Sequence, residues 1–289
     1  GRRLVPRVRP APLPVGRNLV LEPDAFVVVS GGGRGITAEA VLGLCRQVRL
    51  RVLLIGRTPL ATWPHRLPPD LDQPALQRAL AQAAQSNGRK PTLGEITREA
   101  RRLLAARELR ATIAAVAETG SAVKYRAVDI IDQVSVAAAI AALRDRWGPI
   151  RGVIHGAGLV ADKLIRDNTD LQFIDVFRTK VDGLQSLLNA VAGDPLAFIT
   201  IFGSIAARYG NAGQADYAMA NEIMNRAGWM LRNTRPRTKV SVVNWGPWEG
   251  GMVAAGVRAR FEARGVPIIP RRVGVEAFVA ELTRGPVTE

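Results

Sequence analysis

Short apolar runs recur along the chain, and between them apolar residues return every three or four positions, as on one face of a helix. The runs are Phe26–Val29, Val52–Ile55, Ala122–Ala127, Gly152–His155, Ala197–Phe202 and Val240–Asn244. Continuous apolar strands are buried on both faces, which is typical of a parallel sheet covered by helices. The alternation of strands with helix-length segments therefore predicts an α/β fold, with a doubly wound parallel sheet and helices on both faces.

Two segments fall outside this alternation. Residues 1–24 carry five prolines and lack helical spacing, which predicts an extended linker from a larger polypeptide, followed by one domain over residues 25–289. The connection from Thr58 to Gly120 is too long for one ordinary crossover and holds two helical patterns, around Leu76–Ala84 and Leu93–Glu118. We therefore expect a helical insertion at about residues 60–118, after the second strand.

Composition and charge narrow the possible functions. The formal net charge is +15, and the chain has one cysteine, Cys45, and two histidines, His65 and His155, that lie far apart. These residues form no metal-ligating motif of the usual spacing, and no apolar run reaches the roughly 20 residues that cross a bilayer. The basic residues are spread out, without the interleaved aromatic residues of single-strand binders. We expect a cytoplasmic protein with no metal, membrane or nucleic-acid partner, whose charge attracts an anionic cofactor and an acidic protein.

A glycine-rich segment follows the first predicted strand and opens the first predicted helix. Glycines there let the backbone turn tightly and approach a pyrophosphate, and the helix N-terminus offers unpaired N–H groups. The position between strand and helix favours a dinucleotide site of the Rossmann type over an ordinary turn. The candidate cofactor residues of this loop are Ser30, Gly31, Gly32, Gly33, Arg34, Gly35 and Ile36.

The second predicted strand ends at Arg57, where an NAD-specific protein usually carries an acidic residue. An arginine can pair with a 2′-phosphate through two hydrogen bonds, so Arg57 favours NADPH, with Arg34 and Thr58 as helpers. A solvated surface arginine is the alternative interpretation. Asp129 and its neighbour Ile130 follow the third strand, where Asp129 is placed either to accept a hydrogen bond from adenine or to cap a loop or helix.

Four polar residues lie around the fifth predicted strand. Ser204 lies at its end, and Tyr217 and Asn221, four residues apart, share one helix face. Reduction of a ketone needs a proton donor near the oxygen, but a phenol with its free pKa near ~10 is a weak acid. A nearby cation would lower that pKa, and Lys180, on the preceding helix, is the best candidate. Each residue alone has an ordinary structural explanation, whereas their order and spacing together favour a catalytic site.

This combination resembles the short-chain dehydrogenase/reductase superfamily and, within it, the ketoreductase domains of polyketide and polyunsaturated fatty acid synthases. Most of the superfamily places its lysine four residues after the tyrosine, whereas these synthase domains exchange the lysine and the asparagine, as this chain does. The similarity covers roughly Ala25 to Leu282. It extends through His155-Gly156-Ala157-Gly158, Gly213-Gln214, Asn244-Trp245-Gly246-Pro247-Trp248 and Gly250-Gly251-Met252.

The resemblance implies roles for individual residues. Tyr217 would donate the proton and Ser204 would hydrogen-bond the substrate carbonyl. Lys180 would support the tyrosine and a cofactor ribose, and Asn221 would hold the helix geometry or a proton-relay water. Further cofactor contacts are expected from His155, Gly156, Ala157, Gly158, Lys180, Tyr217, Trp245, Gly246 and Pro247. Substrate or lid contacts are expected from Asp162, Tyr209, Gln214, Trp248, Gly251 and Met252, with the lid at about residues 245–270.

Several positions depart from the family pattern. Thr37 replaces the last glycine of the loop, and Arg34 replaces a more common glycine within it. Family members that make the 3R alcohol often carry a leucine and two aspartates after Gly158, of which only Asp162 remains. Tyr209 stands where the opposite stereochemical class usually has tryptophan, so we expect the 3R product. The chain ends where a final sheet strand is expected, so that strand is either missing or differently placed.

The implied activity is NADPH-dependent reduction of a β-ketoacyl thioester to the β-hydroxyacyl thioester. The substrate would be carried on a phosphopantetheinylated acyl carrier protein, and the chain would be one domain of a multidomain polyketide or polyunsaturated fatty acid synthase. Two alternatives remain, a free-standing short-chain alcohol dehydrogenase and a catalytically inactive structural domain of a megasynthase. The exchanged pair Lys180 and Asn221 argues against the first alternative, and the intact catalytic residues argue against the second.

Overall fold

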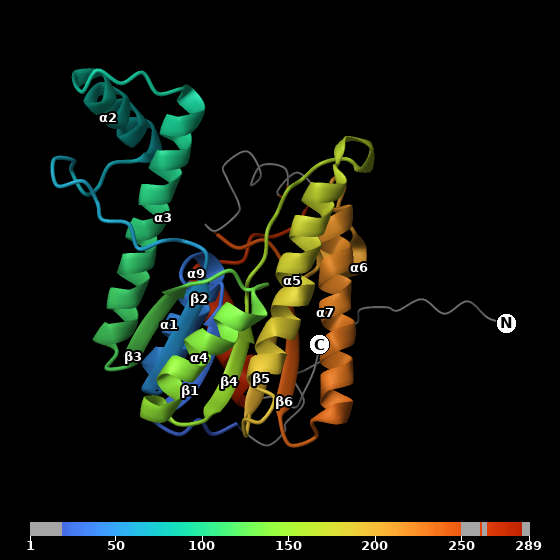
Figure 1. Cartoon of the computed structure of the whole chain (residues 1–289). Helices are drawn as coiled ribbons and strands as arrows, with labels where there is room; N and C mark the ends of the chain where they lie inside the picture. Colours follow the sequence, from blue (N-terminus) through green and yellow to red (C-terminus); the bar gives the residue numbers. More distant parts are fainter. Residues whose placement is uncertain (1–18, 250–260, 262–264, 285–289) are drawn as a thin grey trace.

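The computed structural model describes residues 19–249, 261 and 265–284, and within them six strands form one sheet (Figure 1). The strands are β1 (Ala25–Ser30), β2 (Leu50–Gly56), β3 (Ala122–Ala127), β4 (Ile150–His155), β5 (Phe198–Ser204) and β6 (Lys239–Trp245). Their order is β3-β2-β1-β4-β5-β6, and every neighbouring pair runs parallel. The predicted fold class is confirmed, and each predicted apolar run overlaps one of these strands.

Helices cover both faces of the sheet. They are α1 (Gly35–Gln47), α2 (Gln73–Ser86), α3 (Leu93–Glu118), α4 (Gln133–Trp147), the short 3₁₀ helix η1 (Ile165–Asp167), α5 (Asp170–Ala190), α6 (Ala206–Tyr209), α7 (Ala215–Thr234) and α9 (Arg271–Arg284). On one face α1 packs against α3 and α9, and on the other α5 packs against α4 and α7. Successive side chains of β1 enter opposite cores: Val27 and Val29 lie in one hydrophobic cluster, and Val28 lies in the other.

The order of the strands reverses between β1 and β4. Chains leaving these two strands pass to opposite faces of the sheet, which opens a crevice at the carboxyl ends of the strands, where such folds bind ligands. Backbone hydrogen bonds draw the loops together at this point, because Gly31 N donates to the carbonyl oxygen of Ile55 and Gly156 N donates to that of Ser30. The candidate cofactor loop therefore lies beside the segment that follows β4.

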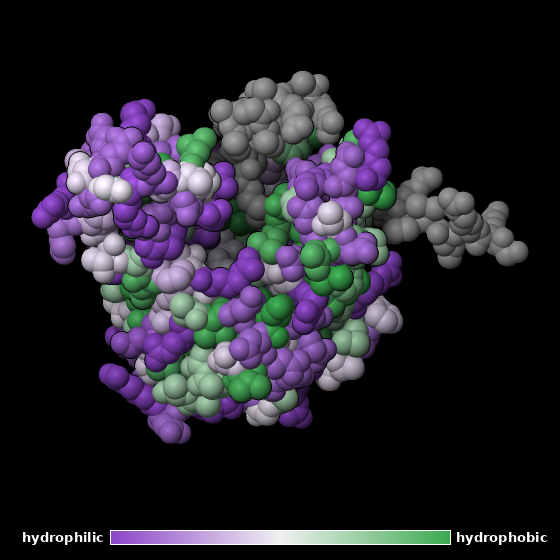
Figure 2. All heavy atoms as spheres, turned by 45° about the horizontal axis from the view of Figure 1, so that its top comes forward, coloured by the Kyte–Doolittle hydropathy of each residue, from purple (hydrophilic) through white to green (hydrophobic). Residues whose placement is uncertain are grey.

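The predicted insertion at residues 60–118 is shorter in the structure, because α3 has two roles. The C-terminal half of α3 is the ordinary crossover between β2 and β3, since Leu109 and Val116 are buried in the core of the sheet. Its N-terminal half packs with α2 around Leu76 and Leu103, in a separate small cluster. A helix of 26 residues extends about 39 Å, longer than the sheet, so this half projects above it (Figure 1). Only the projecting part is an insertion, and its outer surface is mostly hydrophilic (Figure 2).

Some predictions concern residues that the structure does not describe. These are most of the expected linker, most of the expected lid, including Gly251 and Met252, and the end of the chain where a final strand is expected. Among the described residues, no helix is long and apolar enough to span a membrane. No group of three or more His, Cys, Asp or Glu side chains within the same ranges is placed to hold a metal ion.

Candidate active site

The four predicted catalytic residues come together at the carboxyl end of β5. Ser204 is the last residue of β5, Tyr217 lies in the first turn of α7, and Asn221 lies one turn further along the same helix. Ser204 and Asn221 both lie close enough to the Tyr217 hydroxyl to lower its pKa. Lys180, in the middle of α5, reaches the same strand end, where its Nζ donates to the carbonyl oxygen of Phe202 at 2.7 Å. Residues that are up to 41 positions apart thus share one site.

Burial controls the acidity of Tyr217. Desolvation raises the pKa of its hydroxyl above the ordinary value of 10, hydrogen bonds from Ser204 and Asn221 oppose the rise, and the negative charge of Asp162 adds to it. The phenol is therefore protonated at neutral pH. A protonated phenol at the end of β5 can donate its proton to a developing alkoxide.

Lys180 is a buried cation, with only 4% of its surface exposed. Burial lowers its pKa from 10.5 to about 8, so the ammonium form still predominates at neutral pH. Gly158 makes room for this side chain, because a Cβ at that position would lie 3.2 Å from Cε of Lys180. The predicted Gly158 thus lies in close contact with Lys180.

Asn221 is fully buried and holds the first turns of α7. Its Nδ2 donates to the carbonyl oxygen of Tyr217 at 2.7 Å. Its Oδ1 is buried and has no hydrogen-bond partner within the described residues. The side chain therefore fixes the backbone that carries the tyrosine and also presents an acceptor toward the site.

The glycine loop and the segment after β4 lie in close contact. Gly31 has φ +71°, and a Cβ there would lie 2.7 Å from the backbone N of Ala157, so only glycine is accommodated. Gly35 also has a positive φ, +63°, and a Cβ at this residue would meet nothing within 4 Å. The entrance of α1 thus combines a tight turn with open space for a pyrophosphate.

Thr37, the departure from the usual glycine, is accommodated by Gly156. A Cβ at Gly156 would lie 2.3 Å from Oγ1 of Thr37, and Thr37 itself is 3% exposed. The threonine side chain fills the space beside a glycine of the neighbouring loop. The replacement therefore leaves the backbone path of the glycine loop intact.

This contact gives a stability prediction. Gly156→Ala is expected to lower the free energy of unfolding by about 1–3 kcal/mol, because the added methyl overpacks a closed space. In a Thr37→Gly background the same substitution should cost clearly less, and urea unfolding of the four proteins in a double-mutant cycle measures the difference. Equal costs in both backgrounds would contradict the contact.

Three of the predicted cofactor residues have side chains that face the core instead. Ser30 and His155 are both fully buried, and Ser30 Oγ lies 2.8 Å from His155 Nδ1. His155 Nε2 lies 3.0 Å from the carbonyl oxygen of Lys180, and burial lowers the pKa of this histidine to about 3. Ile130 is 4% exposed and packs against Gly183. These side chains tie β1, β4 and α5 together, so a cofactor contact from these residues would come from the backbone.

The corner predicted to bind a 2′-phosphate is exposed. The Arg57 side chain is 53% exposed, and its Nη1 lies 4.0 Å from Oδ2 of Asp129. Asp129 Oδ1 accepts from Ile131 N at 3.3 Å, a local loop contact, and the N-cap of α4 is Asp132. Tyr125, which the sequence did not single out, holds this corner in place, because its hydroxyl bonds the carbonyl oxygens of residues 56 and 58.

On the substrate side, the structure brings two predicted residues together and leaves a third exposed. Gln214 Nε2 donates to Asp162 Oδ1 at 2.8 Å, while Tyr209 is 69% exposed on α6. Trp248 is 2% exposed, and its ring packs at 4.9 Å from that of Trp245. The prediction that Trp248 lines the cleft is wrong, because its large apolar ring is buried beneath α9.

Backbone hydrogen bonds connect the two ends of the expected lid that the structure describes. Ile269 N donates to the carbonyl oxygen of Pro247, and Glu249 N donates to that of Ile269.

Asp216, which the sequence analysis missed, is 1% exposed, and its Oδ1 accepts from Tyr217 N at 2.7 Å. Only the tertiary structure shows that this carboxylate is buried beside the tyrosine.

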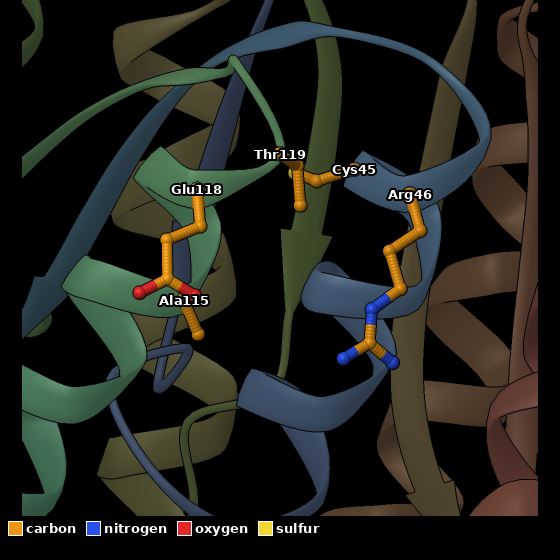
Figure 3. Close-up of a pocket in the computed structure, with 5 residues that line it drawn as sticks. All are labelled: Cys45, Arg46, Ala115, Glu118 and Thr119. Atoms are coloured by element: carbon orange, nitrogen blue, oxygen red, sulfur yellow. The ribbon is translucent and has the colours of Figure 1, made fainter.

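Among the hollows lined by described residues, two lie in different parts of the molecule. One, of about 460 Å³, lies beside the site, between η1 and the segment Gly210–Ala218. The other, of about 350 Å³, lies between the C-terminal ends of α1 and α3, at the opposite edge of the sheet, with Arg46 and Glu118 on its two sides (Figure 3). Burial raises the pKa of Cys45 in the second hollow to about 11, so its thiol is protonated and unreactive. The first hollow includes Ala218, the residue that follows Tyr217 on α7.

The fold is the one seen in solved ketoreductases and short-chain dehydrogenases. The family model for the KR domain matches residues 25–250. The chain therefore belongs to the KR family, the ketoreductase domains of polyketide and polyunsaturated fatty acid synthases.

Individual relatives agree with this assignment. The chain is 36% identical over 273 residues to a polyunsaturated fatty acid synthase from Thraustochytrium sp., covering 91% of this chain and 10% of that protein. It is 36% identical over 199 residues to the polyketide synthase ThaG of Burkholderia thailandensis, covering 65% of this chain and 4% of that protein. The chain thus spans a small fraction of the curated relatives that it matches.

Solved structures show the same fold. An N-terminal ketoreductase from the macrolactin assembly line has a TM-score of 0.70 at 23% identity, over 94% of this chain and 45% of that chain. Carveol dehydrogenase from Mycobacterium avium, solved in complex with NAD, has a TM-score of 0.66 at 13% identity, over 91% of both chains. At such identities the likeness concerns the fold alone.

Proposed function

We propose that this domain reduces a β-ketoacyl thioester, carried on an acyl carrier protein, to the β-hydroxyacyl thioester, with NADPH as the reductant. The observation that carries the proposal is the meeting of Ser204, Tyr217, Lys180 and Asn221 at the carboxyl end of β5. The names of the relatives support the substrate class, since they are polyketide and fatty acid synthases. The partners that we propose are the phosphopantetheinylated carrier and the other domains of a multidomain synthase.

The glycine loop suits a dinucleotide. Gly31 allows the tight turn beside Ala157, and Gly35 leaves space at the N-terminus of α1, where backbone N–H groups and the helix dipole favour a pyrophosphate. Arg34 and Arg57 are exposed beside it and would pair with a 2′-phosphate. Bound NADPH supplies the hydride that adds to the ketone carbon.

The residues of the chain then handle the oxygen of the ketone. The Ser204 hydroxyl donates a hydrogen bond that polarises the carbonyl, and the Tyr217 hydroxyl transfers its proton to the oxygen as negative charge develops there. The Lys180 ammonium stabilises the tyrosinate that remains. Asn221 keeps Tyr217 in position and, through its buried Oδ1, offers an acceptor to a water that returns the proton.

The direct test is the oxidation of NADPH at 340 nm with a β-ketoacyl thioester surrogate, compared with a simple ketone of similar size. We expect turnover of the thioester, and chiral analysis of the product should give the 3R alcohol. Turnover of the simple ketone alone would favour the free-standing dehydrogenase, and failure to bind NADPH would favour an inactive structural domain.

Arg57 gives a prediction about cofactor choice. Arg57→Ala is expected to weaken NADPH binding about ten- to hundredfold, because a charge-assisted pair with the 2′-phosphate is lost. NADH lacks that phosphate, so its affinity should change less than about twofold. Titration of intrinsic fluorescence with both cofactors measures the two effects, and unchanged NADPH affinity would leave Arg57 as a solvated surface arginine.

A further inference from the structure

Glu108 lies at the N-terminus of α1, although it belongs to α3. Its Oε1 accepts a hydrogen bond from Gly35 N at 3.1 Å. Gly35 is the first residue of α1, which has no acidic residue in its first turn and no side-chain cap from Arg34. A carboxylate on another helix therefore supplies the negative charge that this helix end attracts.

Packing holds α3 against the glycine loop. Leu109, the next residue, is 1% exposed, and a Cβ at Gly33 would lie 2.8 Å from its Cδ1. The same Cβ would lie 3.7 Å from the ring of Tyr125, whose hydroxyl bonds the backbone on both sides of Arg57. Glu108 thus lies near the corner where the glycine loop meets the end of β2, the corner at which such folds hold the adenosine ribose.

We propose that Glu108 is a further cofactor-specificity residue. Its negative charge repels the 2′-phosphate of NADPH and so reduces the preference for NADPH over NADH. The inference rests on the proposed function. Like charges repel, so a carboxylate near this corner offsets part of the attraction that Arg34 and Arg57 exert on the phosphate. Both cofactors carry the pyrophosphate, but NADH has a ribose hydroxyl in place of the 2′-phosphate, so the carboxylate repels NADPH more strongly than NADH.

The test is the substitution Glu108→Gln, which removes the charge and keeps an oxygen that can accept from Gly35 N. Its matched control is Glu118→Gln, which makes the same charge change ten residues later on α3, about 15 Å along the axis. Dissociation constants for NADPH and NADH are measured on the whole chain by isothermal titration calorimetry. We expect Glu108→Gln to bind NADPH about three- to tenfold more tightly, with NADH affinity and the control within twofold.

Salt separates an electrostatic effect from a structural one. The gain in NADPH affinity should shrink as ionic strength rises from about 0.05 to about 0.5 M, because screening weakens the repulsion. An unchanged or weaker NADPH affinity in Glu108→Gln would overturn the inference, and so would equal tightening of both cofactors or a gain that salt does not alter. If the wild-type chain binds neither cofactor, the proposed function itself fails. That result differs from one in which the wild type binds both cofactors and Glu108→Gln leaves their affinities unchanged.

Discussion

Tyr217→Phe is expected to lower kcat for thioester reduction by about 10²- to 10⁴-fold, because it removes the proton donor. The ring keeps its packing at the start of α7, so NADPH affinity should stay within about twofold of the wild type. Steady-state oxidation of NADPH gives the first quantity, and a binding titration gives the second. The two results together separate a chemical role of the hydroxyl from a role in binding.

One result would contradict a role of the Tyr217 hydroxyl in proton transfer. A Tyr217→Phe protein that binds NADPH and retains half of the wild-type kcat would rule out the phenol as the proton donor. Ser204→Ala provides a graded comparison, since Ser204 polarises the carbonyl but transfers no proton. Its loss of kcat should be smaller than that of Tyr217→Phe.

Lys180→Met is expected to abolish reduction and, at the same time, to stabilise the cofactor-free protein by up to about 3 kcal/mol at pH 7. The stabilising effect arises because the ammonium is buried, which lowers its pKa from 10.5 to about 8. Methionine has a similar length and no charge to desolvate, so it removes this penalty. Urea unfolding monitored by circular dichroism measures the change.

The pH dependence of stability tests the same cause. Below pH 8 the lysine is protonated in both the folded and the unfolded states, and the whole penalty is present. Between pH 8 and 10.5 Lys180 binds more protons in the unfolded state than in the folded state, so this residue contributes a rise of the free energy of unfolding with pH. Cys45, whose pKa burial raises from 9.0 to about 11, contributes a fall above pH 9 in every variant compared. Lys180→Met should lack this rise.

A matched control isolates the effect of burial. Lys124 is exposed on β3, so Lys124→Met should leave the rise between pH 8 and 10.5 in place. If Lys180→Met keeps the same pH dependence as the wild type, the lysine is not desolvated as described. A Lys180→Met protein that is much less stable at pH 7 would show that its bond to the Phe202 carbonyl outweighs the burial penalty.

Sequence reasoning found the residues of the site better than it found their roles. Tyr217 and Asn221 are neighbours on one helix, and helical spacing alone places them on one face. Ser30 and His155 end two strands whose following loops are typical of cofactor contacts, yet their side chains bond each other inside the core. Which way a side chain points at a strand end depends on the opposite strand, and no local pattern in the sequence reports that.

Contacts between distant segments also decide where Trp248 lies and where the insertion after β2 ends. Trp248 follows a glycine and a proline, so it reads as part of a mobile lid, but the packing of α9 against α1 creates a closed space that its ring fills. The predicted insertion extended to residue 118 because the helical pattern runs without interruption along α3. Only the contacts of Leu103 and Leu109 with two different clusters show where the insertion ends and the crossover begins.

The sequence by itself determined the α/β class, the positions of the strands, the glycine loop and the candidate catalytic residues. These depend on short-range features: apolar runs buried on both faces, glycine at tight turns, and the four-residue spacing of a helix. The tertiary structure alone decided the contact of Glu108 with Gly35, the burial of Asp216 and Lys180, and the fit of Thr37 against Gly156. Each of these joins side chains to distant parts of the chain, so their burial and acidity follow from how the helices pack on the sheet.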